Sequence, residues 1–148
     1  MDPLLDPLIH FIRQLVELES PSDHKPSLDR LSEFLADGLS PVARVRLHRA
    51  RANGNHLRAE FHLPGRKKSG QILLLGHHDT VYGAPGGNDN ASGTIAVLET
   101  ARVLAGLRRE TGTAPGRTLH FVTFAAEEQG FLGSGQFVRR HYGGGRRP

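Results

Sequence analysis

The amino-acid sequence predicts an α/β fold with a mixed, partly parallel sheet. Two short runs, 72–75 (ILLL) and 119–126 (LHFVTFAA), are almost entirely apolar, as expected of strands that are covered on both faces. The segment between them, 92–107, carries apolar residues at helical spacing, and two further helical patterns precede the first run. This order of elements favours a layered α/β domain in which the two apolar strands lie parallel.

The first 40 residues predict two amphipathic helices. The segment 4–19 carries its apolar residues on one helical face: Leu5, Ile9, Ile12 and Val16. The segment 26–39 has a similar stripe: Leu28, Leu31, Phe34, Leu35 and Leu39. The tetrapeptide 20–23 (SPSD) stops the first helix, and we expect Asp23 or Ser27 to cap the second.

A β-hairpin is predicted next, followed by the apolar strands. Apolar and polar residues alternate on both sides of the turn 52–55 (ANGN), which is typical of two half-buried antiparallel strands. The polar loop 64–70 leads to strand 72–75, and a solvated loop over 108–116 separates helix 92–107 from strand 119–126. A short helix over about 134–141 completes the predicted elements.

Composition indicates a single domain without thiol chemistry. The chain has 148 residues, enough to bury a core but too few for a second large domain. Cysteine is absent, which excludes disulfides, thiolate zinc ligands and a cysteine nucleophile. Any metal would therefore bind through His, Asp or Glu. We expect one domain over 1–142 and a disordered Gly/Arg tail over 143–148.

The basic charge lies at the C-terminal end. The formal net charge is +4, and the last ten residues contain four arginines and no acid, so the rest of the chain is formally neutral. This distribution argues against the hypothesis of a basic nucleic-acid-binding protein. No segment approaches the roughly 18 apolar residues of a membrane span, and the first residues do not resemble a signal peptide. We expect no nucleic-acid or membrane partner and a cytoplasmic location.

Polar side chains with metal-binding chemistry follow the two apolar strands. His77 and Asp79 come directly after strand 72–75, and Glu127 and Glu128 follow strand 119–126. Ligands in open α/β sheets bind beyond the carboxyl ends of the strands, so these residues are expected to share one edge. Asp89 lies in the glycine-rich loop that returns to the next helix. The pattern indicates a cation such as zinc, held by one imidazole and several carboxylates.

Side-chain alternation suggests a division of roles within this set. His77 and Asp79 are two residues apart and are expected to point to the same face, so Asp79 can hold the imidazole ring of a ligating His77. Asp89 offers two oxygens and can bridge two ions. If extended, Glu127 and Glu128 point to opposite sides, which lets one ligate while the other accepts a proton from water.

Three segments resemble the signature segments of the co-catalytic di-zinc aminopeptidases: "GHHDTV", "PGGNDNASG" and "RTLHFVTFAAEEQGFLGS". This family includes bacterial leucyl aminopeptidases, glutamate carboxypeptidase II and glutaminyl cyclases. The resemblance implies a three-layer zinc-exopeptidase fold and two zinc ions. It implies His77 and Glu128 as ligands of separate ions, Asp89 as the bridging ligand and Glu127 as general base. It also implies a non-proline cis peptide after Asp89.

The N-terminal portion resembles a neighbouring family. The segments "LVELESPSDHKPSLDRLSEFL", "GNHLRAEF" and "ILLLGHHDTVY" are similar to carboxypeptidase G and acetylornithine deacetylase, which share the catalytic fold. The two resemblances together imply hydrolysis of a peptide or an N-acyl amino acid. Both families use a further acidic ligand and a late histidine beyond the Glu-Glu pair, and of five expected ligands only three have matching positions here.

Two hypotheses about activity follow from this partial match. The first is a zinc-dependent metallopeptidase of exopeptidase or aminopeptidase type. The alternative is a truncated, catalytically inert relative that binds metal weakly, holding one zinc ion or none, or that needs a partner chain. The resemblance covers roughly the first half of a catalytic domain, so the sheet is expected to have an exposed edge through which a homodimer can form.

Overall fold

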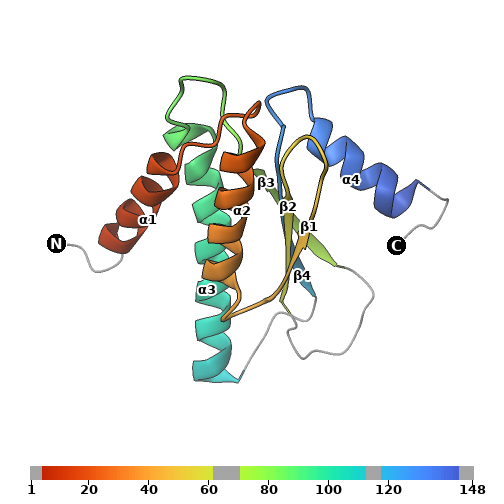
Figure 1. Ribbon diagram of the computed structural model, residues 1–148. Coiled ribbons are helices and arrows are strands. Elements are labelled where there is room, and N and C mark those ends of the chain that lie inside the picture. The colour runs from red at the N-terminus through yellow and green to blue at the C-terminus, as the bar shows by residue number, and fades with distance from the viewer. Residues whose placement is uncertain (1–4, 62–70, 113–117, 144–148) are drawn as a thin grey trace.

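A four-stranded mixed sheet forms the middle of a three-layer arrangement (Figure 1). The computed structural model describes residues 5–61, 71–112 and 118–143. The strands are β1 (Arg44–His48), β2 (His56–Phe61), β3 (Ile72–His77) and β4 (Leu119–Phe124), in the order β1-β2-β4-β3. The pairs β1–β2 and β2–β4 are antiparallel and the pair β3–β4 is parallel, which confirms the predicted mixed sheet and the hairpin around 52–55.

The helices of the described residues cover both faces of the sheet (Figure 1). Helices α2 (Lys25–Leu39) and α3 (Ser92–Thr111) contact the strands, and α1 (Leu5–Glu17) packs against α3 and the turn η1 (Gly87–Ala91). The main core lies between these helices and the sheet; its fully buried members include Leu35, Leu39, Leu57 and Phe121. The helix α4 (Leu132–Tyr142) packs on the opposite face through Phe137, against Val122 and Phe124.

The expectation that strand 72–75 is covered on both faces is wrong. β3 is an edge strand, and Leu73 and Leu75 are 56% and 57% exposed. Leu75 lies in register with Val122 of β4, but Val122 is buried together with Phe137 of α4 whereas Leu75 is exposed. Only Leu74, which faces the three helices, packs against the main core.

Helix ends also differ from the prediction. Neither Asp23 nor Ser27 caps α2, which begins after His24 without a side-chain cap bond. Ser27 instead accepts a hydrogen bond from the guanidinium of Arg30, with a nitrogen-to-oxygen distance of 2.9 Å. α3 continues four residues beyond the predicted end at 107, and it begins directly after η1.

Two expectations fall largely outside the described residues. The predicted Gly/Arg tail covers 143–148, of which the structure describes only Gly143. The whole of the polar loop 64–70 lies outside the described residues. Among the helices that are described, none has the length and apolar character needed to span a membrane.

Candidate metal centre

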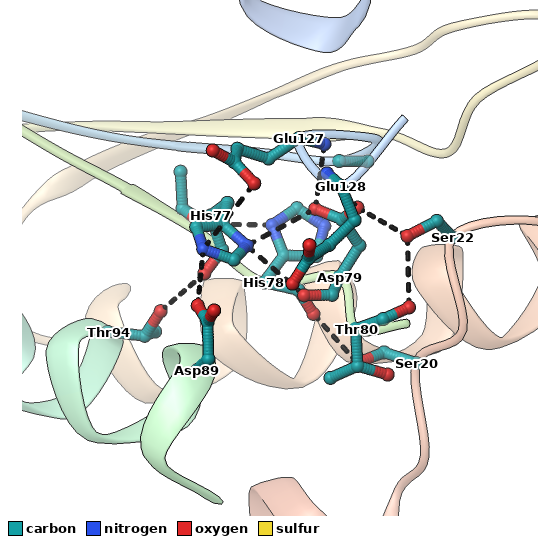
Figure 2. A network of polar contacts seen from close by, with 12 residues as sticks. Ser20, Ser22, His77, His78, Asp79, Thr80, Asp89, Thr94, Glu127 and Glu128 are labelled. Carbon is teal, nitrogen blue, oxygen red and sulfur yellow. Dashed lines mark hydrogen bonds and ion pairs between the residues drawn. The ribbon is translucent and has the colours of Figure 1, made fainter. Parts of the chain in front are cut away.

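The parallel pairing of β3 and β4 brings the predicted site residues together. His77 is the last residue of β3 and lies in register with Phe124, the last residue of β4. The pairing continues one step further, because the backbone N–H of His78 donates to the carbonyl of Phe124 at 3.0 Å. The polar segments that follow the two strands therefore meet at one edge, as Figure 2 shows.

Asp79 connects these two segments. Its carboxylate is fully buried and accepts hydrogen bonds from the backbone N–H of Glu127 to Oδ1 at 3.0 Å and of Glu128 to Oδ2 at 3.2 Å. The same carboxylate lies 3.5 Å from Nδ1 of His77, which also contacts the carbonyl oxygen of Asp79 at 3.1 Å. Asp79 thus fixes the His77 ring and the backbone of both glutamates at once.

The connector between α1 and α2 supports Asp79 from behind. The hydroxyl of Ser22 donates to Oδ2 of Asp79 at 2.6 Å and to the carbonyl of Thr80 at 2.9 Å (Figure 2). Ser20 donates to the carbonyl of His78 at 2.7 Å, and Pro21 forms a parallel β-bridge with Thr80. Sequence reasoning missed both serines because the tetrapeptide 20–23 reads locally as a helix stop, and no local signal indicates contacts across almost 60 residues.

Three side chains form a group that fits a metal ion. One ligand atom each from His77, Glu127 and Glu128 lies within 4.8 Å of the other two. Donor atoms of a tetrahedral zinc ion, each about 2.0–2.2 Å from it, lie about 3.3–3.6 Å apart. Nε2 of His77 lies 3.0 Å from Oδ1 of Asp89, the expected bridging ligand, slightly below that spacing. Nitrogen and carboxylate donors are also the types that zinc accepts, so the residues present fit the ion.

The structure places Asp89 beside this group. Its Oδ1 lies 3.0 Å from Nε2 of His77, but its side chain is 73% exposed and is not one of the three that cluster most closely. The bond between Asp89 and Asn90 is a cis peptide, as the family resemblance implies. Thr94 at the start of α3 donates to the carbonyl of His77 at 2.9 Å. This hydrogen bond connects β3 to α3, the helix that follows the loop of Asp89.

The two glutamates do not point to opposite sides as predicted for an extended segment. Both belong to the group around His77, because the chain leaves β4 in a turn. Ala126 has a φ of 58°, in the left-handed region, and this reverses the chain before Glu127. Alternation fails here because it holds only while the backbone stays extended.

The electrostatics of the site favour a bound cation. Burial opposes protonation of His77, but contact with Asp79 and the charge of Glu127 outweigh it and raise the pKa of His77 to about 9. Partial burial and the charge of Asp89 raise the pKa of Glu128. Burial also acts to raise the pKa of Asp79, yet hydrogen bonds from His77 and Ser22 hold it below its ordinary value. One imidazole thus faces several carboxylates, an excess of negative charge that a divalent ion would neutralise.

Comparisons with known proteins agree with this geometry. Residues 61–146 match the model of peptidase family M28. An aminopeptidase of Bacillus subtilis (YwaD) is 40% identical over 67 residues, which is 45% of this chain and 13% of that protein. A probable leucine aminopeptidase of Arthroderma benhamiae is 35% identical over 86 residues, covering 53% of this chain. The chain spans 24% of the length of that relative.

Solved structures support the same fold. The LapA aminopeptidase of Legionella pneumophila superimposes on 91% of this chain and 38% of its own, with a TM-score of 0.77 and 21% identity. A zinc aminopeptidase from Bacillus subtilis covers 61% of this chain and 20% of its own, with a TM-score of 0.51 and 32% identity. The family match begins at residue 61, so the N-terminal resemblance to the carboxypeptidase G group stays a prediction. With more than half of its residues matched, including all five predicted site residues, the chain belongs to peptidase family M28.

Proposed function

We propose that this protein is a zinc-dependent metallopeptidase of aminopeptidase type. The observation that carries the proposal is the group formed by His77, Glu127 and Glu128 at the carboxyl ends of two parallel strands, with Asp79 buried behind it. The match to peptidase family M28 and the aminopeptidase names of its relatives support the reaction class.

His77 and Glu128 are the residues that would hold zinc directly, and Asp89 would add a carboxylate from the loop. A bound zinc ion supplies a water molecule of lowered pKa and polarises a carbonyl oxygen. Asp79 keeps Nε2 of His77 directed at the ion position, since its carboxylate and carbonyl oxygen both lie beside Nδ1. The proposal includes two zinc ions at this site, as in the di-zinc family.

Glu127 would serve as the general base. Its carboxylate lies at the site beside His77, and its backbone is held in place by Asp79. There it can accept a proton from the attacking water and return it to the departing amine, which completes the hydrolysis of an amide bond. The substrate class is a peptide with a free amino end; N-acyl amino acids are the second substrate class to test.

A matched pair of variants tests the proposal. Zinc content by elemental analysis and turnover of an aminoacyl p-nitroanilide are measured for the wild-type chain, Glu127→Gln and Glu33→Gln. Loss of a general base lowers turnover by about 10²–10⁴, so we expect Glu127→Gln to be inactive with its zinc retained. Glu33→Gln removes an exposed carboxylate from α2 and should match the wild type.

The same measurement separates the proposal from the alternative of an inert relative. That alternative predicts less than one zinc ion per chain and no turnover in any variant. Turnover of Glu127→Gln equal to the wild type would instead reject Glu127 as the base.

A further inference from the structure

A second site lies on the other face of the sheet, between α4 and the loop that follows β1. This pocket has a volume of about 450 Å³. Three arginines and three histidines are among its lining residues, and none of the lining residues is acidic: Arg49, Arg51, Arg140, His48, His56 and His141. It shares no residue with the candidate metal centre.

The walls of the pocket are held in place by ring contacts. The rings of His48 and Phe137 pack edge to face with centroids 5.2 Å apart, and the ring of His141 lies 4.4 Å from Phe137 and 4.8 Å from His48. Arg140 donates from Nη1 to the backbone carbonyl of Arg49 at 3.3 Å, which ties α4 to the loop. The pocket is therefore formed before any ligand arrives, which lowers the cost of binding.

The pocket lining combines a buried imidazole with an excess of positive charge. Nε2 of His48 is buried and has no hydrogen-bond partner among the residues that the structure describes. Burial, followed by the charges of His141, Arg58 and Arg140, lowers the pKa of His48 to about 4. Cations crowded around an uncharged ring, with no carboxylate in the lining, create a positive potential that an anion would relieve.

We propose that this pocket binds a small molecule that carries an oxyanion, either a phosphate or a carboxylate. Guanidinium groups present planar pairs of donors that match both kinds of oxyanion. Arg49 and Arg51 come from one side of the pocket and Arg140 from the other. The pocket is larger than a single phosphate group needs, and its imidazole and phenyl walls provide a surface for the remainder of the molecule.

Backbone amide NMR of the full 148-residue chain tests this inference. Inorganic phosphate and succinate, which represent the two oxyanion sources, are titrated separately at constant ionic strength. We expect saturable shifts for residues of the pocket with at least one of them. Arg140→Gln should weaken binding at least tenfold, about 1.4 kcal/mol.

Two further variants make the result specific. Arg49→Gln removes a pocket cation but keeps the backbone carbonyl that Arg140 contacts, so it should weaken binding without loosening α4. Arg13→Gln removes the same charge from the exposed side of α1 and should leave the affinity unchanged. Absence of saturable shifts with either ligand would overturn the proposal. So would an equal loss of affinity in Arg13→Gln, because binding would then reflect only net charge.

Discussion

The hydroxyl of Ser22 lies 2.6 Å from Oδ2 of Asp79, a contact that joins the connector between α1 and α2 to the candidate metal centre. Asp79 in turn holds His77 and the backbone of both glutamates. Ser22 is thus a positioning residue that touches none of the proposed ligand atoms. The N-terminal helices contribute to the site through this contact as well as to the core.

Replacing Ser22 by alanine should weaken zinc binding. The substitution leaves Oδ2 of Asp79 with only the Glu128 N–H as donor, and loss of such an outer-shell partner typically costs about 10–100-fold in metal affinity. Competition with a chromogenic chelator measures the affinity. Ser40→Ala, which removes an exposed hydroxyl from the end of α2, is the control and should bind zinc as the wild type does. Equal zinc affinity of the two variants would mean that Ser22 supports only the fold and not the metal centre.

Replacing Gly133 should loosen α4. A Cβ atom at this position would collide with the backbone carbonyl of Ala125, just after β4, and with the ring of His56. Forcing extra volume into such a contact costs about 1–3 kcal/mol, so Gly133→Ala should lower the free energy of unfolding by that amount.

Gly106→Ala is the matched control for this substitution. Gly106 lies within α3 and a Cβ there meets nothing within 4 Å, so alanine should stabilise the helix by about 0.5–1 kcal/mol. Urea unfolding measures both variants. A loss of stability at Gly106 or a gain at Gly133 would contradict the packing described for these helices.

Stability should fall as the pH drops below about 6.5 because of the histidines that line the pocket beside α4. The pKa of His48 is lowered from 6.5 to about 4 in the folded protein, and those of His56 and His141 are lowered as well. Between pH 6.5 and about 4 the unfolded chain therefore binds more protons than the folded one, so acid favours unfolding. The stability that these uncharged histidines contribute is fully present above pH 6.5 and is lost as the pH falls towards 4.

His48→Phe tests the contribution of His48 by itself. Phenylalanine keeps a ring beside Phe137 but cannot be protonated, so the loss of unfolding free energy between pH 7.5 and pH 5 should shrink. His10→Phe, on the exposed side of α1, should keep the wild-type dependence. Identical pH dependence of the wild type and His48→Phe would refute the assignment.

The exposed edge at β3 is expected to support self-association. Leu73 and Leu75 are more than half exposed, and no other strand among the described residues pairs with the outer side of β3. We propose that two copies pair there, since an uncovered apolar edge strand is a template for another strand.

Sedimentation velocity should show a dimer that Leu73→Lys and Leu75→Lys convert to monomer. Val103→Lys is the control, because Val103 is 64% exposed but belongs to α3 and offers no strand edge for pairing. A monomeric wild-type chain would rule the dimer out.

Local sequence patterns were sufficient to predict most elements of this fold. Helical spacing located α1, α2 and α3, and the turn 52–55 located the β-hairpin. The parallel pairing of β3 and β4 also follows from the pattern, and it places His77, Asp79, Glu127 and Glu128 at one edge. These predictions depend on local spacing, turn residues and the order of the elements, which the sequence displays directly.

The features that sequence reasoning missed depend on distant contacts. Nothing in the run at 72–75 shows that it forms the edge strand of the sheet, so its exposure was predicted wrongly. The left-handed φ of Ala126 turns both glutamates to one side, although alanine gives no signal for that conformation. Ser22 reaches Asp79 across 57 positions of sequence. In each case tertiary packing overrides what the local pattern indicates.

The most direct test of the account is an anomalous-scattering map at the zinc absorption edge, from crystals of the protein purified with zinc. The account predicts two peaks, one about 2.0–2.2 Å from Nε2 of His77 and the other at the same distance from a carboxylate oxygen of Glu128. A peak among His48, His56 and His141 instead, or no peak near His77 in zinc-saturated crystals, would contradict the central claim.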